Sequence, residues 1–284
     1  MSFSSSASSP NPQHQARKRF GQNFLVDTGI IDKIIKSIAA KSTQRIVEIG
    51  PGQGALTLPL LETCDHLDVV EVDRDLVARL SKLKEKYNNL HIHEGDALKF
   101  NFSQLVDKEN SLRVVGNLPY NISTPLIFHL LEAAVQIEDM HFMLQKEVVD
   151  RIVARKGSKQ YGRLSVIVQY YCKTDCLFLV PPECFSPRPK VQSAIVRLEP
   201  HRSLPFIAND IALLKQLVNR CFQQRRKTLR NSLRTLLPLE VVTTIGEQEG
   251  IDITLRPENL DVKDYVKLAN LLDRDFRDQL FNLE

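Results

Sequence analysis

The chain has 284 residues, of which 43% are hydrophobic and 25% are charged, and its formal net charge is +4. This composition is ordinary for a globular protein and excludes a collagen-like, coiled-coil or wholly disordered chain. The sequence has no run of about 18 apolar residues, so we expect no membrane span. The polar N-terminus lacks the apolar core of a signal peptide. Five cysteines, an odd number without C-x-x-C spacing, indicate reduced thiols and a cytoplasmic protein.

Helical and strand-like segments alternate along most of the chain. Residues 1–16 are rich in Ser, Pro, Gln and Asn, which predicts a disordered tail. From Asp27 a helical period is followed by the short buried strand RIVEIG, and the alternation continues through the strands LDVVEVD, LHIHEGD, LRVVGNLPY and MHFMLQ. Two further β-like runs flank a Pro-rich loop before Pro200. This order predicts an α/β fold with a mostly parallel sheet, covered on both faces and antiparallel at one end.

The composition changes near residue 200. The β pattern stops there, which divides the chain into an α/β domain at 17–200 and a helical domain at 201–284. Eight basic residues and one acid lie between 201 and 238, whereas eleven acids and five basic residues lie between 239 and 284. A basic block of this kind favours a polyanionic partner met by one face of the molecule.

A glycine-rich loop, Glu48-Ile49-Gly50-Pro51-Gly52-Gln53-Gly54-Ala55, directly follows the first buried strand. Glycines let the backbone approach a ligand closely, and the next helix begins with unpaired N–H groups. Gly50, Gly52 and Ala55 satisfy the dinucleotide fingerprint G-x-G-x-x-G/A. The pattern E-x-G-x-G-x-G more closely resembles the cofactor loop of S-adenosylmethionine-dependent methyltransferases. A tight strand-to-helix turn is the alternative interpretation.

Acids follow the next two strands. Glu71 lies 21 residues after Gly50, where a carboxylate accepts hydrogen bonds from both ribose hydroxyls. Asp96 is placed to accept from an exocyclic amino group such as adenine N6. A solvated strand end for Glu71 and a helix cap for Asp96 are the alternatives. His91 and His93 share one strand face, but no further ligands accompany them, so we expect no metal site.

Asn117-Leu118-Pro119-Tyr120 follows the fourth strand. The exocyclic amine of adenine is a poor nucleophile because its lone pair is delocalised into the ring. The Asn117 amide oxygen and a backbone carbonyl of Leu118 or Pro119 can accept from its two N–H bonds and aim the lone pair at a sulfonium methyl group. Tyr120 is expected to stack on the base. Phe185, in a Pro-rich loop, is expected to cover the other face of a flipped base, or else to anchor the core.

Several motifs occur in order along the chain. They are QNFL (residues 22–25), EIGPGQGALT, GDAL, GNLPYNIST, MLQKEV, FSPRPKVQSA, QRRKTLRNSL and LRPENL (residues 255–260). The ordered set resembles the ribosomal RNA adenine N6,N6-dimethyltransferase family that acts on the small subunit, from about Arg17 to Asp273. Single motifs are shared with other nucleic-acid adenine methyltransferases, but the set is specific.

The resemblance implies a fold, an activity and site residues. The fold is a Rossmann-like methyltransferase fold with a doubly wound, mostly parallel seven-stranded sheet and a small all-α C-terminal domain. The activity is the transfer of four methyl groups to two adjacent adenosines in a hairpin near the 3′ end of the small-subunit RNA, without a metal. The cofactor-binding positions are Asn23, Leu25, Gly50, Glu71, Asp96 and Asn117. The target-adenine positions are Asn117, Leu118, Pro119, Tyr120 and Phe185.

The basic segment NRCFQQRRKTLRNSLR predicts an RNA-binding surface. Its six positive charges, without an acid, suit RNA phosphates; they belong to Arg220, Arg225, Arg226, Lys227, Arg230 and Arg234. A solvated helix face is the alternative. The expected partner is small-subunit ribosomal RNA, free or in a subunit assembly intermediate, and no coiled-coil or extended apolar surface pattern calls for more than a monomer.

Three other functions remain open from the sequence. A non-catalytic ribosome-assembly or RNA-binding factor could use the same scaffold, although Glu71, Asn117 and Tyr120 are all present. A large-subunit adenine methyltransferase is disfavoured by NLPY together with RRKTLRNSL and LRPENL. An NAD-dependent oxidoreductase would explain the glycine loop, but neither NLPY nor the basic segment.

Overall fold

The computed structural model describes residues 23–106 and 111–280, without the side chains of 246–249. The tail predicted at 1–16 therefore lies outside the described residues.

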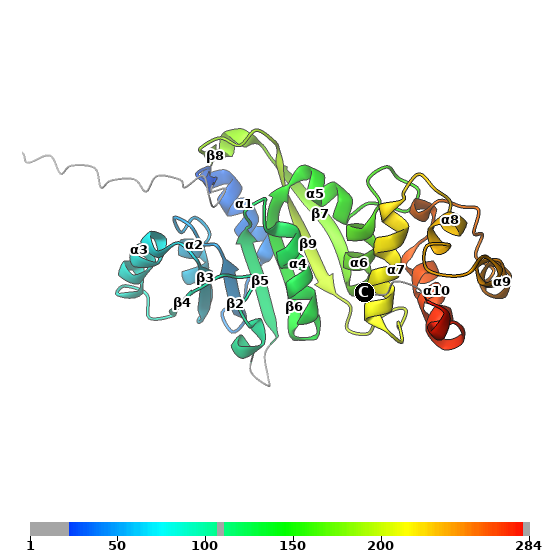
Figure 1. The fold of residues 1–284 in the computed structure, drawn as a ribbon. Helices are drawn as coiled ribbons and strands as arrows, with labels where there is room; N and C mark the ends of the chain where they lie inside the picture. The colour runs from blue at the N-terminus through cyan, green and yellow to red at the C-terminus, as the bar shows by residue number, and fades with distance from the viewer. Residues whose placement is uncertain (1–22, 107–110, 281–284) are drawn as a thin grey trace, which may run out of the picture.

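A seven-stranded sheet forms the centre of the molecule, with the strand order β4-β3-β2-β5-β6-β9-β7 (Figure 1). Its strands are β2 (Arg45–Ile49), β3 (Leu67–Glu71), β4 (Leu90–Glu94), β5 (Leu112–Asn117), β6 (Ile137–Gln145), β7 (Cys172–Val180) and β9 (Ser193–Pro200). Strands β2 to β6 are mutually parallel, and β9 is antiparallel to both β6 and β7. The predicted mostly parallel sheet with an antiparallel end is confirmed.

Helices cover both faces of this sheet (Figure 1). One cluster of buried hydrophobic residues lies between one face of the sheet and the helices α1 (Thr28–Ile38), α2 (Thr57–Leu61) and α3 (Arg74–Lys84). A second cluster joins the other face to α4 (Ser123–Glu132), α5 (Lys146–Ile152) and α6 (Arg163–Tyr171). Helix α6 was not predicted from the sequence. Its sequence, RLSVIVQYY, is a short apolar run rich in β-branched residues, whose pattern does not separate a buried helix from a buried strand.

The strand order reverses between β2 and β5. From β2 the chain proceeds outward to β3 and β4 and then returns to β5 on the other side of β2. In open α/β sheets, ligands bind outside the carboxyl ends of the strands at such a reversal. Gly116 allows the two strand ends to approach, because a Cβ atom there would lie 2.6 Å from the Ile49 carbonyl oxygen. The glycine loop and Asn117 are therefore brought to one place.

Two distant segments pair above this point. Strand β1 (Phe24–Leu25) is antiparallel to β8 (Phe185–Ser186). The Val26 amide also donates to the Cys184 carbonyl over 2.9 Å. The N-terminal QNFL stretch is thus fixed to the Pro-rich loop, at the end of the sheet where the parallel strands finish (Figure 1).

Between Pro200 and Leu280, the last described residue, helices alone follow the last strand, as predicted. Beyond Pro200 the α-helices are α7 (Ile211–Gln223), α8 (Leu229–Leu233), α9 (Leu239–Glu249) and α10 (Val262–Asp275). Their buried residues, such as Leu217 and Leu268, belong to the same hydrophobic cluster as Ile167 of α6 and Val114 of β5. The division into two domains at residue 200 stays a prediction, because this core is continuous across it. Over the described ranges, no helix has both the length and the apolar character that crossing a membrane requires.

Candidate active site

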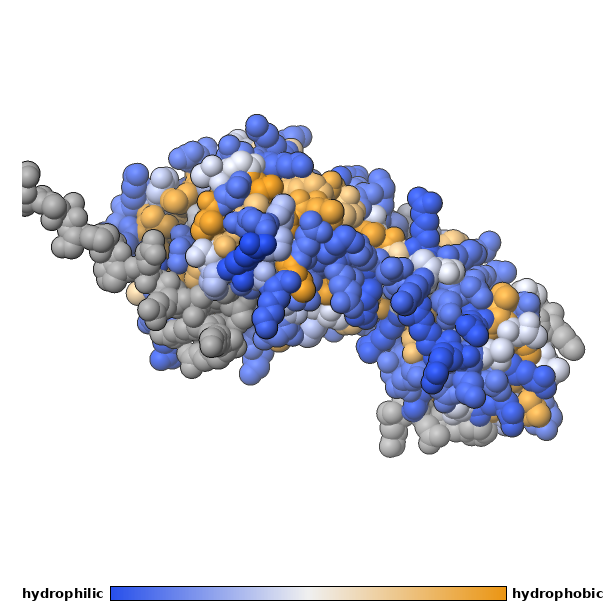
Figure 2. All heavy atoms as spheres, turned by 90° about the horizontal axis from the view of Figure 1, so that it is seen from above, coloured by the Kyte–Doolittle hydropathy of each residue, from blue (hydrophilic) through white to orange (hydrophobic). Residues whose placement is uncertain are grey.

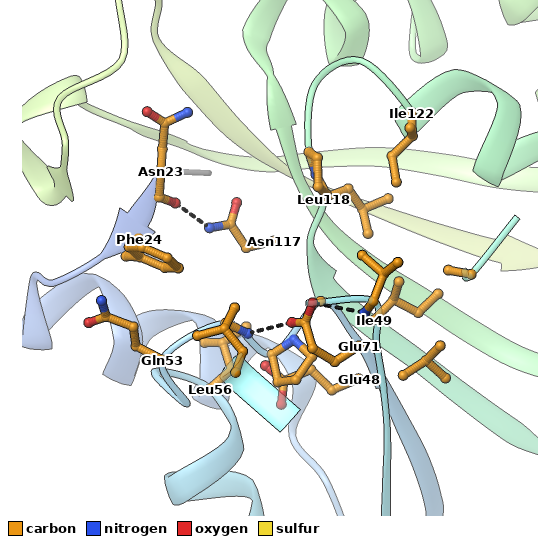
Figure 3. A pocket seen from close by; sticks show the side chains of 18 of the residues that line it. Asn23, Phe24, Glu48, Ile49, Gln53, Leu56, Glu71, Asn117, Leu118 and Ile122 are labelled. Atoms are coloured by element: carbon orange, nitrogen blue, oxygen red, sulfur yellow. Dashed lines mark hydrogen bonds between the residues drawn. The ribbon is translucent and has the colours of Figure 1, made fainter. Parts of the chain in front are cut away.

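A cavity of about 270 Å³ opens at the reversal point of the sheet (Figure 3). Its walls come from β1 and from the segments that follow β2, β3, β4 and β5. The lining includes the predicted residues Asn23, Leu25, Gly50, Glu71, Asp96, Asn117, Leu118, Pro119 and Tyr120. Phe185 is not among the lining residues.

The glycine loop forms the floor of this cavity. Gly50 and Gly52 have φ values of +65° and +58°, a region that favours glycine. A Cβ atom on Gly52 would lie 3.2 Å from the Phe24 ring, so the missing side chain also makes room for Phe24. Phe24 lines the cavity and was not singled out from the sequence, although it lies between the predicted Asn23 and Leu25.

Glu71 is held by the backbone around it. One carboxylate oxygen accepts from the Val72 and Asp73 amides, each over 2.9 Å, and the other accepts from the Gly52 amide over 3.3 Å. Burial raises the pKa of Glu71, and these three N–H groups oppose that rise. The second oxygen, with one long bond, is directed to the glycine loop. Glu71 is thus fixed in the wall of the cavity, and its ribose contact stays a prediction.

A second buried acid, Glu48, also lines the cavity. Its side chain is 2% exposed and accepts from the Thr57 hydroxyl over 2.7 Å. Burial is the main reason that the pKa of Glu48 rises to about 7, and the Glu71 carboxylate adds to the rise. Glu48 was not singled out from the sequence as a site residue, although it is the first residue of E-x-G-x-G-x-G.

Asp96 lies beside the cavity after β4. Its carboxylate accepts from the Leu98 amide over 3.0 Å, which is the local capping role considered as the alternative. The two roles are compatible, because a carboxylate accepts several hydrogen bonds.

Asn117 ends β5 with its amide group in the cavity. Nδ2 donates to the Asn23 carbonyl over 3.0 Å, as Figure 3 shows, so the planar amide directs Oδ1 away from Asn23. The Leu118 amide donates to the Met143 carbonyl over 3.2 Å. The Pro119 carbonyl accepts from the Ile122 amide over 3.2 Å. These bonds fix the NLPY backbone between β6 and the start of α4.

Tyr120 lines the cavity and is half-buried. Its hydroxyl forms a 2.8 Å hydrogen bond with the Ser193 hydroxyl at the start of β9. Burial raises the pKa of Tyr120, so its hydroxyl remains protonated.

Phe185 is placed differently from the other predicted target residues. Its side chain is 4% exposed and belongs to the buried cluster that includes Leu25 and Ile34. This position matches the core-anchor alternative, whereas the base-stacking role stays a prediction. Through the β1–β8 pairing, Phe185 nevertheless supports Asn23 and Phe24, which do line the cavity.

Of the six predicted RNA-binding residues, Arg220 lies on α7 and Arg230 lies on α8. Arg225, Arg226 and Lys227 lie between the two helices, and Arg234 directly follows α8. Arg226, Lys227, Arg230 and Arg234 are exposed. Arg225 instead donates to the Ser158 and Lys159 carbonyls of the loop between α5 and α6 and lies 3.9 Å from the Glu258 carboxylate. From above, hydrophilic residues dominate the C-terminal helical part, whereas apolar residues gather over the α/β part (Figure 2).

Comparisons with known proteins identify the family of this chain. The family model for ribosomal RNA adenine dimethylase matches residues 13–274. The ribosomal RNA small subunit methyltransferase A of Marinomonas sp. is 56% identical over 92% of this chain and 97% of its own. The protein of the same name from Saccharophagus degradans is 56% identical over 93% of this chain and 97% of its own.

Solved structures give the same fold. The crystal structure of a dimethyladenosine transferase from Plasmodium falciparum has a TM-score of 0.77 and 31% identity, and the match covers 91% of this chain and 99% of that chain. The 23S rRNA methyltransferase ErmE, at 24% identity and a TM-score of 0.67, covers 89% of this chain and all of its own, and it supports the fold alone. The predicted fold class is confirmed. With a family model that spans nearly the whole sequence and relatives that share more than half of its residues, the chain belongs to the ribosomal RNA adenine dimethylase family.

Proposed function

We propose that this protein transfers methyl groups from S-adenosylmethionine to the N6 atoms of two adjacent adenosines in the 3′-terminal hairpin of small-subunit ribosomal RNA, giving dimethyladenosine. The observation that carries the proposal is the position of the NLPY segment. Asn117 to Tyr120 line the same cavity as the glycine loop, Glu71 and Asp96. Family membership and the 56% identical relatives named as small-subunit methyltransferases support the substrate class.

The cavity fits S-adenosylmethionine as the methyl donor. The left-handed Gly50 and Gly52 provide a floor without side chains, and Glu71 offers a carboxylate oxygen to ribose hydroxyls. Asp96 would accept from the adenine amino group, and Asn23 and Leu25 would cover the ligand from the N-terminal side. The buried Glu48 suits a cationic group of the ligand, because such a group would favour its ionised form. Bound there, S-adenosylmethionine supplies a methyl sulfonium that needs no metal for activation.

The chain's own residues then prepare the target amine. Asn117 Oδ1 accepts a hydrogen bond from one N–H group of the flipped adenine. We assign the second acceptor to the Leu118 carbonyl, because the Pro119 carbonyl already accepts from Ile122. These two acceptors favour a more tetrahedral nitrogen with its lone pair directed at the methyl carbon. Tyr120 stacks on the base, a contact worth about 1–3 kcal/mol.

The remaining assignments concern the partner. We propose a monomeric, cytoplasmic enzyme that acts on a small-subunit assembly intermediate. Residues 17–200 would hold the cofactor, and the helical residues 201–284 would bind RNA. The exposed Arg226, Lys227, Arg230 and Arg234 would contact phosphates, together with Arg220. Arg225 would act mainly by holding the α7–α8 segment on the loop between α5 and α6.

The test is the transfer of labelled methyl from S-adenosylmethionine to small subunits that lack the modification, with mature subunits and unmodified large subunits as controls. Nuclease digestion then identifies the product nucleoside. We expect N6,N6-dimethyladenosine from the unmodified small subunits alone. Binding of S-adenosylmethionine without transfer would favour a non-catalytic assembly factor, and methylation of large subunits would contradict the assigned substrate.

A further inference from the structure

Tyr120 forms hydrogen bonds through both its backbone carbonyl and its side-chain hydroxyl. On the backbone side, the Tyr120 carbonyl accepts from the Ser123 hydroxyl over 3.2 Å at the start of α4. On the far side, the Tyr120 hydroxyl bonds the Ser193 hydroxyl over 2.8 Å. Tyr120 lines the cavity, whereas Ser193 is not among the lining residues. Ser193 therefore contacts the Tyr120 hydroxyl without itself lining the cavity.

Ser193 is itself rigidly placed. It is the first residue of β9, is 0% exposed, and stands in register with Gln145 on one side and Val180 on the other. The preceding Gln192 carbonyl accepts from the Lys146 amide over 2.9 Å. The ladder on both sides fixes the backbone, so the Ser193 hydroxyl is a fixed point for the tyrosine. Because the pKa of Tyr120 is raised, its hydroxyl stays neutral and the bond persists at ordinary pH.

We propose that Ser193 is a positioning residue that holds the Tyr120 ring in the orientation in which it receives the target base; the inference rests on the proposed function. A hydrogen bond at the far end of a tyrosine ring further restricts rotation about its Cα–Cβ bond. If the ring becomes ordered only when the base binds, the entropy cost of ordering it lowers the affinity for that base. A ring that is already ordered does not add this cost. The Ser193 hydroxyl supplies this order before RNA binds.

The test is a double-mutant cycle between Ser193→Ala and Tyr120→Phe. Either substitution removes the hydroxyl–hydroxyl bond. The loss of one such bond changes an equilibrium constant by about threefold to tenfold. We expect each variant to raise KM for unmodified small subunits by that factor, with kcat changed less than twofold and the Kd for S-adenosylmethionine unchanged. The double variant should be no worse than either single variant, because the bond is lost only once. Ser193→Cys, whose thiol takes the place of the hydroxyl but bonds weakly, should resemble Ser193→Ala.

The matched control is Ser37→Ala. Ser37 also donates a short hydrogen bond, of 2.7 Å to the Ile34 carbonyl, but it lies on α1 and does not line the cavity. This variant should keep the wild-type KM. Additive losses in the Ser193–Tyr120 cycle would overturn the proposal. A fall in melting temperature and cofactor affinity that matches the loss of kcat/KM would overturn it too, since both outcomes indicate a merely structural serine.

A measurement without RNA separates this inference from the proposed function. The chain has six tyrosines, so ring-labelled tyrosine gives few resonances, and Tyr120→Phe identifies the one that belongs to Tyr120. Ser193→Ala should shift and sharpen that resonance, because the ring gains freedom. An unchanged resonance would refute the positioning role even if methyl transfer is observed. Absence of methyl transfer by the wild-type protein would instead refute the proposed function.

Discussion

Asn117 is the residue on which the proposed chemistry depends most directly. Its amide is oriented by the Asn23 carbonyl, so Oδ1 faces the place where the target amine is expected. The same residue lines the cavity proposed for the cofactor, but it is one of many that do so. Loss of this side chain should therefore affect the methyl transfer step far more than cofactor binding.

We predict that Asn117→Ala lowers kcat for methyl transfer by on the order of 10²–10³-fold, the loss typical when one preorganised polar group at a reacting centre is removed. Binding of S-adenosylmethionine should weaken only moderately. Calorimetric titration of the cofactor beside single-turnover transfer would separate the two effects. The exposed Asn209 provides the control, since Asn209→Ala should leave both unchanged. Equal activity of Asn117→Ala and wild type would disprove the assigned role.

Glu48 makes stability depend on pH in an unusual direction. Burial raises its pKa from 4.5 to about 7, so between those values the folded protein keeps a proton that the unfolded chain releases. Its contribution to stability is therefore highest below pH 4.5 and falls as the pH rises to about 7. The whole fall amounts to about 3 kcal/mol for a shift of this size. A bound cation would offset the penalty at neutral pH.

We predict that Glu48→Gln removes this dependence. The free energy of unfolding of the variant, minus that of wild type, should be higher at pH 8 than at pH 4.5 by about 3 kcal/mol. Urea denaturation at a series of pH values measures the difference. A difference independent of pH would show that Glu48 titrates normally in the folded protein.

The difference between variant and wild type is needed because His141 acts in the opposite direction. Burial lowers the pKa of His141 to about 4, beside Asp139, Arg113 and Arg197. The unfolded chain therefore binds the proton first, and the contribution of His141 to stability is lost as the pH falls from 6.5 to about 4. In wild type the two residues largely cancel between pH 4.5 and 6.5.

At the scale of the elements, the ends of β2 and β5 determine the geometry of the cavity. Gly116 lets the β5 backbone pass the Ile49 carbonyl at a distance that a Cβ atom would reduce to 2.6 Å. One end carries the glycine loop, and the other carries Asn117. A shift between the two strands thus changes the distance between the glycine loop and the Asn117–Tyr120 segment.

We predict that Gly116→Ala destabilises the protein by about 1–3 kcal/mol, as overpacking in a core typically does. It should also lower methyl transfer, because the two strand ends are forced apart. Gly95→Ala is the matched control for stability. Gly95 also lies at a strand end, but a Cβ atom there meets nothing within 4 Å, so the free energy of unfolding should change by less than about 0.5 kcal/mol. Chemical denaturation of both variants would decide; an equally mild loss in both would contradict the steric argument.

The sequence predicted the sheet and most of the cavity because local patterns and motif order carry that information. The glycine loop, the acids after β3 and β4, and NLPY each follow a strand, and parallel strands bring their ends together. Phe185 differs because the burial of one aromatic residue in a loop depends on long-range packing. Its pairing with Leu25 crosses most of the α/β part of the chain. Local periodicity likewise leaves α6 ambiguous between helix and strand.

At the scale of the whole molecule, the sequence shows where positive charges cluster, but not which of these side chains form hydrogen bonds within the protein. The sequence treats Arg225 and Arg226 alike, but the structure engages Arg225 with the loop between α5 and α6 and leaves Arg226 exposed. No spacing rule distinguishes the two, since the distinction depends on which side chain faces a neighbouring loop.

We predict that Arg226→Gln combined with Lys227→Gln weakens RNA binding most at low salt. The slope of log K against log salt concentration should decrease in magnitude by about 1.4–1.8, which is 0.7–0.9 for each lost phosphate contact. Filter binding of the small-subunit RNA over a range of salt concentrations measures this slope. The control removes the same charge from α3, with Lys82→Gln and Lys84→Gln, which are also exposed. If both double variants changed the slope equally, net charge rather than the α7–α8 segment would account for binding.

The hydrophobic cluster that runs from β5 through α6 into α7 and α10 also has a practical consequence. A gene shortened at residue 200 would not encode a smaller working methyltransferase. It would expose the buried residues of α6, which now contacts α7 and α10, and we expect such a fragment to aggregate. In calorimetry, the intact chain should melt in one endotherm whose van't Hoff and calorimetric enthalpies agree. RNA bound to the C-terminal helices would then raise the melting temperature of the whole chain, including the residues around the cavity.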